Sequence, residues 1–398
     1  MLSTASTLLK NKALSMAADA LVKDSEIILN ANKLDMEKAK DNNISEVMQD
    51  RLKLTKPRIE GMADGLKQLA ALPDPVGEII DGSRRPNGLE ITKKRVPFGV
   101  VGIIYESRPN VTADAAGICL KSGNVCILRG GKEAINSNLA IAGIISREIA
   151  NAGLPADCVQ ILENTSREIA SEFMKLNKYI DVLIPRGGAG LINSVLENAT
   201  MPVIQTGTGN CHIYADESAD LEMALKIIIN AKVQKPSVCN AVETVLINEK
   251  IADSFLPELC AELVKNKVEI RGCEEVRRIF PAAVPATEED WATEYNDLIL
   301  AIKVVKSLQE AIDHINKYST QHSEAIITKD YANALKFQDN VDAACVYVNA
   351  STRFTDGEEF GLGAEIGISN QKLHARGPMG LREMTTIKYT INGSGQIK

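Results

Sequence analysis

From Val100 onward, short apolar segments alternate with amphipathic ones, and this alternation constrains the fold more than any other feature of the chain. Short apolar runs bounded by turn residues are typical of buried strands, whereas longer runs with apolar residues three or four positions apart are typical of helices. The predicted strands are 100–104, 125–128, 159–162, 180–184 and 203–205, and the predicted helices are 112–121, 132–150, 166–176 and 188–199. The alternation predicts an α/β fold with a parallel sheet covered by helices on both faces.

A second α/β series occupies the C-terminal half, and helices occupy the N-terminal one-fifth. The second series has predicted helices at 218–233, 250–266, 307–317 and 330–337, strands at 242–247, 298–304, 324–328 and 343–348, and an irregular stretch at 271–293. Residues 1–72 show helical spacing, with Asp24/Ser25 and Thr55 as helix starts. Residues 81–88 are predicted to form turns, and 89–96 and 385–391 alternate like exposed edge strands.

Composition excludes several classes of protein. The net charge is −7 and aromatic residues make up only 4% of the 398 residues, so a basic, aromatic nucleic-acid surface is not expected. No apolar run approaches the roughly 20 residues that cross a bilayer, and the start lacks the pattern of a signal peptide. The eight cysteines form no C-x-x-C pair and do not cluster with the four histidines. We therefore expect no metal site, no disulfide framework and no membrane contact, as in a reduced, cytoplasmic enzyme.

Cys239 is the candidate nucleophile. It lies in the run Lys235-Pro-Ser-Val-Cys-Asn-Ala-Val-Glu243, where Pro236 ends a helix and a strand follows. Backbone N–H groups at such a turn can stabilise a thiolate and later an oxyanion. The alternative is an inert, buried thiol, because unpaired cysteine is among the most buried residue types.

Three polar segments follow strands of the first predicted sheet, where such sheets bind ligands. In 128–133, Arg129, Gly130 and Lys132 combine positive charge with a close backbone approach and suit a phosphate. In 184–191, Arg186, Gly187 and Gly188 precede a helix whose N–H groups suit a pyrophosphate; the alternative is a tight turn without a ligand. The third segment, 105–112, is Tyr-Glu-Ser-Arg-Pro-Asn-Val-Thr, and it is either a ligand loop or a solvated helix cap.

These motifs resemble those of the aldehyde dehydrogenase superfamily, and most closely its gamma-glutamyl phosphate reductase family. The family-like motifs are 105–112, Ile-Pro-Arg-Gly-Gly (184–188), Lys-Pro-Ser-Val-Cys-Asn-Ala (235–241), Gly-Leu-Gly-Ala-Glu-Ile-Gly-Ile-Ser (361–369) and His-Ala-Arg-Gly-Pro-Met-Gly-Leu (374–381). The resemblance covers essentially the whole chain. It implies a Rossmann-type nucleotide-binding domain, a second α/β catalytic domain and a small β flap for oligomerisation.

The resemblance also implies boundaries and partners. The NADP-binding domain would comprise 1–80, 99–205 and 361–384, the catalytic domain 206–360, and the oligomerisation strands 81–98 and 385–398. We accordingly expect a homo-oligomer, a dimer or tetramer, because closed symmetric pairing removes exposed strand edges. The substrate would be L-glutamyl 5-phosphate, an intermediate of proline biosynthesis, and a transient contact with glutamate 5-kinase is possible.

The resemblance assigns roles to individual residues. Cys239 would be the nucleophile, NADPH the hydride donor, and Glu294 the carboxylate that holds the nicotinamide ribose; the alternative for Glu294 is an ordinary surface carboxylate. Arg129 and Lys132 are candidates for the 2′-phosphate of NADP. The oxyanion would be held by the Cys239 backbone N–H and a side chain from 105–112, either Asn110 or Arg108. Candidate substrate residues are Ser107, Arg108, Arg353, His374 and Arg376.

One departure from the hydrolytic relatives bears on the reaction. Where those enzymes carry a glutamate that activates water, this chain has Pro202-Val-Ile-Gln-Thr-Gly-Thr-Gly-Asn210, and neither Gln205 nor Thr206 is a base at neutral pH. A Cys239 thioester is therefore expected to await hydride rather than water. Two alternatives stay open: a hydrolytic, NAD-linked aldehyde dehydrogenase, and a catalytically silent protein with the same fold.

Overall fold

A computed structural model of the chain describes residues 1–42, 44 and 46–398. The chain divides into two compact units. Unit 1 comprises 1–206, 361–367 and 379–398, and unit 2 comprises 207–360 and 368–378. Within the described ranges, no helix combines the length and apolarity that a bilayer span needs, and no three side chains of metal-binding type gather.

Unit 1 is built on a four-stranded sheet. Its strands are β3 (Val100–Tyr105), β4 (Val125–Arg129), β5 (Val159–Ile161) and β6 (Val182–Arg186), in the order β5-β4-β3-β6. Every neighbouring pair is parallel, as the alternation predicts. The strand predicted at 203–205 is wrong, because only Val203 forms an isolated bridge, to Leu183.

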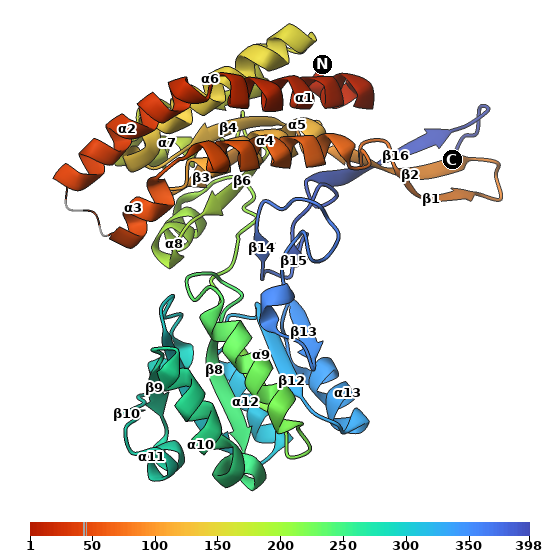
Figure 1. Cartoon of the computed structure of the whole chain (residues 1–398). Coiled ribbons are helices and arrows are strands. Elements are labelled where there is room, and N and C mark those ends of the chain that lie inside the picture. Colours follow the sequence, from red (N-terminus) through yellow and green to blue (C-terminus); the bar gives the residue numbers. More distant parts are fainter. Residues whose placement is uncertain (43, 45) are drawn as a thin grey trace. The chain divides into compact units, whose positions relative to one another are not determined.

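Helices cover this sheet, and the N-terminal helices form part of the cover (Figure 1). They are α1 (Thr7–Lys23), α2 (Ser25–Asp41), α3 (Glu46–Leu52), α4 (Lys56–Ala71), α5 (Asn110–Lys121), α6 (Ile135–Ala152), α7 (Arg167–Phe173) and α8 (Ala189–Asn198). The predicted start at Thr55 is confirmed, since its hydroxyl accepts the Arg58 N–H at 3.4 Å. The helical prediction for 1–72 also includes residues 43 and 45, which lie outside the described residues.

A three-stranded antiparallel sheet extends from unit 1 (Figure 1). Its strands are β1 (Ile79–Arg84), β2 (Glu90–Pro97) and β16 (Thr385–Asn392), in the order β1-β2-β16. The turn predicted over 81–88 is wrong in its first half, which belongs to β1. The turn is confined to 85–88, where Gly88 has φ +90°. The predicted strands at 89–96 and 385–391 are confirmed as β2 and β16.

Unit 2 contains a seven-stranded sheet in which all neighbouring strands are parallel. Its strands are β7 (Cys211–Ala215), β8 (Val242–Asn248), β9 (Glu269–Gly272), β10 (Val284–Pro285), β11 (Ile299–Val305), β12 (Ser323–Ile327) and β13 (Cys345–Val348), in the order β10-β9-β11-β8-β7-β12-β13. Its helices are α9 (Leu221–Val233), α10 (Glu249–Lys265), α11 (Glu274–Ile279), α12 (Leu308–Tyr318) and α13 (Tyr331–Asn340). The sequence predicts neither β7 nor α11.

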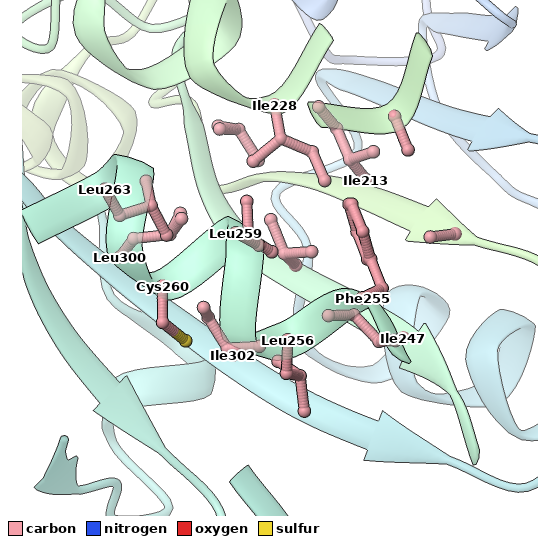
Figure 2. Close-up of a cluster of buried hydrophobic side chains, with 14 of the residues drawn as sticks. Ile213, Ile228, Ile247, Phe255, Leu256, Leu259, Cys260, Leu263, Leu300 and Ile302 are labelled. Atoms are coloured by element: carbon pink, nitrogen blue, oxygen red, sulfur yellow. The ribbon is translucent and has the colours of Figure 1, made fainter. Parts of the chain in front are cut away.

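Helices cover both faces of this sheet. Successive strand residues point to opposite faces, so Ile213 joins one apolar core and Tyr214 the other. The larger core packs α9 and α10 against the sheet, with Phe255 and Leu259 fully buried (Figure 2). The smaller core packs α12 and α13 against the other face. A sheet buried on both sides explains why its strands are rich in Val and Ile.

Residues 368–378 group with unit 2, although the sequence analysis assigns them to the first domain. They form the short strands β14 (Ile368–Ser369) and β15 (Gly377–Pro378). Three hydrogen bonds tie the segment to unit 2. Gly207 N–H donates to Ile368 O at 2.9 Å, Asn370 Nδ2 to Thr320 O at 2.7 Å, and Arg376 Nη2 to Asp342 Oδ1 at 2.7 Å.

The fully buried His322 is a group through which acid should destabilise unit 2. Its Nδ1 lies 2.8 Å from Ser323 Oγ, and burial lowers its pKa to about 4. A histidine with a lowered folded-state pKa contributes its full stability above the ordinary value of 6.5, and this stability is lost as pH falls toward 4. We expect this histidine to remove about 2 kcal/mol of unfolding free energy between pH 7 and pH 5.

The measurement is urea unfolding at both pH values for the parent and His322→Asn. Buried carboxyls such as Glu324, whose pKa burial raises, change stability in the opposite direction in both proteins. The difference between the two pH dependences therefore isolates His322. Equal loss of stability in the two proteins would contradict the assignment.

Candidate active site

The three polar segments predicted to bind ligands lie side by side at one edge of the unit 1 sheet. Strand β3 is flanked by β4 and β6, and the pairs Ile104–Arg129 and Tyr105–Arg186 are in register. The loops that follow, 106–109, 130–131 and 187–188, therefore begin next to one another. This arrangement is the one expected at the carboxyl ends of parallel strands.

Glu106 occupies the middle of this cluster, and sequence reasoning gave it no role. Its Oε2 accepts the Gly188 N–H at 3.0 Å, at the N-terminus of α8. A Cβ added to Gly187 would lie 2.6 Å from Glu106 Cδ, and one added to Gly131 would lie 3.4 Å from Ser107 N. The absence of side chains at these two glycines allows the 106–109 loop to pass between the neighbouring turns.

Arg129 and Lys132 flank the glycines of the β4 turn. Arg129 Nη2 donates to Thr165 O at 2.6 Å, while its buried Nε has no partner within the described structure. Burial lowers the Arg129 pKa, and the charge of Glu133 opposes this shift. Lys132 is exposed at the start of a short 3₁₀ helix, Lys132–Ala134. One guanidinium is thus held in place and one ammonium reaches solvent.

Asn110 is the first residue of α5, and its side chain donates to Asp114 Oδ2 at 3.0 Å. Burial raises the Asp114 pKa to about 6, and the Asn110 hydrogen bond and the Arg186 charge oppose that rise. Ser107 Oγ donates to Glu133 Oε2 at 3.4 Å, and Arg108 N–H donates to Glu106 O at 2.6 Å. The predicted residues of unit 1 therefore form one polar cluster.

The Cys239 turn of unit 2 lies where the sequence predicts it, between α9 and β8. Ala241 N–H donates to Val238 O at 3.0 Å and closes the turn. Cys239 is half-buried, whereas six of the other seven cysteines, all but Cys273, are buried, and all eight are thiols. Partial exposure is what a reactive thiol requires.

The neighbours of this turn come from the amino ends of the unit 2 strands, not from their carboxyl ends. Gly209 precedes β7, Cys239 precedes β8, and Glu294 precedes β11. Gly209 N–H donates to Glu294 Oε1 at 2.7 Å. A Cβ on Gly209 would lie only 1.4 Å from Cys239 O, and Cys211 Sγ donates to the same oxygen at 3.1 Å.

Asn240 and Arg353 hold the other side of the turn. The buried Asn240 donates from Nδ2 to Thr355 O at 2.8 Å and accepts at its backbone oxygen from Thr352 Oγ1 at 2.7 Å. Arg353 Nη1 donates to Asn240 Oδ1, and its Nε donates to Gln234 Oε1 at 3.0 Å. The sequence does not predict Gly209, Cys211 or Asn240 as site residues. Of the three, only Asn240 lies in one of the family-like motifs, 235–241.

A buried ion pair supports the segment that carries Glu294. Glu243 Oε2 accepts from Lys232 Nζ at 2.5 Å, and its Oε1 accepts the Asn296 N–H at 3.2 Å. Both side chains of the pair are fully buried. Burial raises the Glu243 pKa to about 7 against the opposing charge of Lys232, and burial lowers the Lys232 pKa. The pair therefore links α9 and β8 to the residues just after Glu294.

Arg376 and His374 belong to the 368–378 segment of unit 2. Arg376 Nη2 donates to Asp342 Oδ1 at 2.7 Å, and Lys372 Nζ lies 2.5 Å from Asp342 Oδ2. His374 has a φ of 69°, which is rare for a residue with a side chain. The described contacts thus hold Arg376 by Asp342 rather than by the Cys239 turn.

Comparison with known proteins identifies the fold and its relatives. The aldehyde dehydrogenase family matches residues 10–276 and 282–390. A gamma-glutamyl phosphate reductase of Caldanaerobacter subterraneus subsp. tengcongensis is 61% identical over 389 residues, covering 98% of this chain and 94% of that protein. One from Clostridium beijerinckii is 60% identical over 397 residues, covering 100% and 96%. The crystal structure of gamma-glutamyl phosphate reductase from Thermotoga maritima superposes with a TM-score of 0.98 at 53% identity, covering 100% and 96%. The predicted fold class is confirmed.

Replacing Gly209 with alanine tests the packing of the Cys239 turn. The added methyl group cannot coexist with Cys239 O at 1.4 Å, so the turn must move. A moved turn no longer directs its backbone N–H groups at the thiolate that they stabilise. We therefore expect Gly209→Ala to slow alkylation of Cys239 by iodoacetamide, as measured by peptide mass spectrometry.

Gly143→Ala is the matched control. Gly143 lies in α6, where an added Cβ meets nothing within 4 Å, and its alkylation rate should equal that of the parent. An unchanged alkylation rate in Gly209→Ala would show that the 209–211 segment does not fix the turn.

Proposed function

The chain belongs to the aldehyde dehydrogenase family, and on that premise we propose that it reduces L-glutamyl 5-phosphate to L-glutamate 5-semialdehyde with release of phosphate, a step of proline biosynthesis. The half-buried Cys239 on a turn held from both sides is the observation that carries the chemistry. The relatives named gamma-glutamyl phosphate reductase, about 60% identical over nearly the whole chain, support the substrate.

Cys239 acts as the nucleophile in this proposal. Its thiolate attacks the acyl carbon, a C–S bond forms, and the C–O bond to phosphate breaks with phosphate as the leaving group. When bound, NADPH supplies a hydride to the acyl carbon. The resulting oxyanion then re-forms a carbonyl as the C–S bond breaks, which releases the semialdehyde and regenerates the thiolate. In unit 2, the Cys239 backbone N–H stabilises the oxyanion. Asn110 and Arg108 of unit 1 are the candidate side chains for the same role.

The residues of the unit 1 cluster fit a dinucleotide phosphate. Gly188 has nothing within 4 Å of an added Cβ, and its N–H already binds an anion, the Glu106 carboxylate. Gly130, Gly187 and Arg186 line the same edge of the sheet. Lys132 and Arg129 add positive charge, which favours the 2′-phosphate of NADP over the bare ribose of NAD. In unit 2, Glu294 is the proposed ligand of the nicotinamide ribose.

Substrate recognition is assigned to residues with hydrogen-bonding or charged side chains. Ser107 and Arg108 of unit 1, and His374 and Arg376 of unit 2, are the candidates for binding the phosphate and the α-carboxylate of the substrate, because hydroxyl, imidazole and guanidinium groups all bind such anions. Arg353 is the remaining candidate for substrate binding. It differs from Arg376 because two of its nitrogens donate to residues of the Cys239 turn.

Hydrolysis of the acyl enzyme is the competing reaction. It requires a base for water, and the 202–210 segment contains no acidic or histidine side chain. The carboxylate that approaches this segment is Glu294, whose Oε1 already accepts the Gly209 N–H. These two observations favour reduction over a hydrolytic, NAD-linked activity, and the half-exposed Cys239 argues against a silent protein.

The decisive experiment is the reverse reaction, with glutamate semialdehyde, NADP or NAD, and inorganic phosphate present or omitted. We expect NADP reduction only with phosphate, a preference for NADP over NAD, and a loss of about a thousandfold or more in Cys239→Ser. Cys239→Ser should still bind NADPH, which fluorescence titration measures. Phosphate-independent formation of free glutamate would contradict the proposal and support hydrolysis.

We also propose a homo-oligomer, a dimer or tetramer, formed through β1, β2 and β16. Ile387, Tyr389 and Ile391 alternate along β16 and are 42%, 55% and 57% exposed. Residues two apart on a strand point to the same side, so these three form one apolar face on a strand with an unpaired edge within its described sheet. A second copy of the chain would cover that face.

The acyl phosphate is easily hydrolysed, so a transient contact with cytoplasmic glutamate 5-kinase is part of the proposal.

The double variant Ile387→Lys/Ile391→Lys tests this interface. Two charges on the apolar face should convert the assembly into monomers at micromolar concentration, as measured by light scattering after size exclusion. Thr386→Lys places a charge on the opposite face of the same strand and should leave the assembly intact. If the Ile387→Lys/Ile391→Lys variant remains oligomeric, β16 is not the interface.

A further inference from the structure

We propose that Arg353 is a positioning residue, which clamps the Cys239 turn in the shape that makes its thiol reactive, and that it does not bind the substrate. The inference deepens the proposed function, because it rests on Cys239 being the nucleophile. It depends on contacts within unit 2 alone.

Arg353 spans the turn from one end to the other. Gln234 is the residue directly after α9, and Asn240 is the residue after Cys239. Arg353 donates to the side chains of both, through Nε to Gln234 Oε1 at 3.0 Å and through Nη1 to Asn240 Oδ1. A planar guanidinium with fixed donors holds two acceptors at a set separation, which a flexible ammonium cannot do as well.

Asn240 passes this restraint on to the backbone. It is 4% exposed, and its amide nitrogen donates to Thr355 O at 2.8 Å and to Arg353 O at 3.3 Å. Its backbone oxygen accepts from Thr352 Oγ1 at 2.7 Å. The short 3₁₀ helix Thr352–Phe354 therefore forms hydrogen bonds with both the side chain and the backbone of Asn240. The Asn240–Ala241 peptide, one residue beyond Cys239, cannot rotate without breaking the bond from Thr352.

The charge of Arg353 acts in the same direction as its geometry. The guanidinium is close enough to Cys239 and Asp356 to interact with them electrostatically. Burial lowers the Arg353 pKa, and the negative charges of Asp356 and the Cys239 thiolate oppose this shift. An arginine remains protonated under these conditions, so it favours the thiolate over the thiol.

A substrate ligand would present its donors to the substrate, whereas two of the Arg353 nitrogens already donate to protein acceptors. Removing the charge should therefore reduce the reactivity of Cys239 without weakening substrate binding. The two roles predict opposite results. Loss of a substrate ligand raises KM and leaves the thiol unchanged, while loss of the clamp slows the thiol and leaves KM unchanged.

The test is Arg353→Gln, with alkylation of Cys239 by iodoacetamide at pH 7 and steady-state kinetics in the reverse direction. We expect alkylation and kcat each to fall about tenfold, the size expected for a lost charged hydrogen bond, and KM for the semialdehyde to stay within about twofold. Arg353→Lys should recover part of the alkylation rate, because it keeps the charge but not the fork. Far-UV circular dichroism and urea unfolding check that both variants fold.

Arg278→Gln is the matched control, since Arg278 lies in the same unit but donates to Asp253 and Glu275 and has no proposed role in the reaction. It should leave the alkylation rate of Cys239 at the parental value. A raised KM with a parental alkylation rate in Arg353→Gln would overturn the proposal and make Arg353 a substrate ligand. A parental alkylation rate together with a parental kcat would also overturn the proposal. Slowed alkylation in a chain whose parent lacks phosphate-dependent reductase activity would uphold the clamp and refute only the proposed function.

Discussion

The close contact between the Gly209 backbone and the carbonyl of Cys239 is the constraint on which the unit 2 site depends. No side chain fits between them, because an added Cβ would lie 1.4 Å from the oxygen. The same approach brings the Gly209 N–H to Glu294 and the Cys211 thiol to the Cys239 oxygen. The segment before β7 and the turn before β8 thus meet at the amino ends of adjacent strands. The Cys239 turn is held by backbone packing on this side and by Asn240 and Arg353 on the other.

The unit 1 cluster follows the same rule with a different outcome. In unit 1, glycine at positions 131 and 187 leaves room for the 106–109 loop between the turns that follow β4 and β6. The loop carries Asn110 at its end, and Glu106 within it contacts the N-terminus of α8. Any anion that binds the Gly188 N–H must therefore displace or share it with Glu106. The proposed cofactor residues and Asn110, a proposed oxyanion donor, therefore lie in one connected cluster of unit 1.

Local patterns predicted most of this architecture, and the exceptions have physical causes. Apolar runs identify β3 and β6, because these strands are buried on both faces, and helical spacing identifies helices such as α6, which buries one face. The sequence does not reveal β7, because two buried polar residues interrupt the apolar pattern there: Asn210 directly before the strand, and His212 within it, whose backbone N–H donates to Glu324 at 2.6 Å. The Arg353–Asn240 contact joins positions 113 apart. Only the folded chain brings such residues together, so the motif around Cys239 could suggest the nucleophile but not what holds it.

The carboxylates around the Cys239 turn bear on the choice between hydride and water. Burial raises the Cys211 pKa, and the nearby charges of Glu324, Cys239, Glu243 and Glu294 raise it further, so three carboxyl groups lie near this second thiol. Each has a partner: Glu324 accepts from His212, Glu243 from Lys232, and Glu294 from Gly209. A carboxylate oxygen that already accepts a protein N–H or ammonium is not oriented to take a proton from a water molecule, even where burial raises the pKa of the group, as it does for Glu243 and Glu324. A thioester on Cys239 would then persist until hydride arrives, which is the order of events that an acyl phosphate reductase requires.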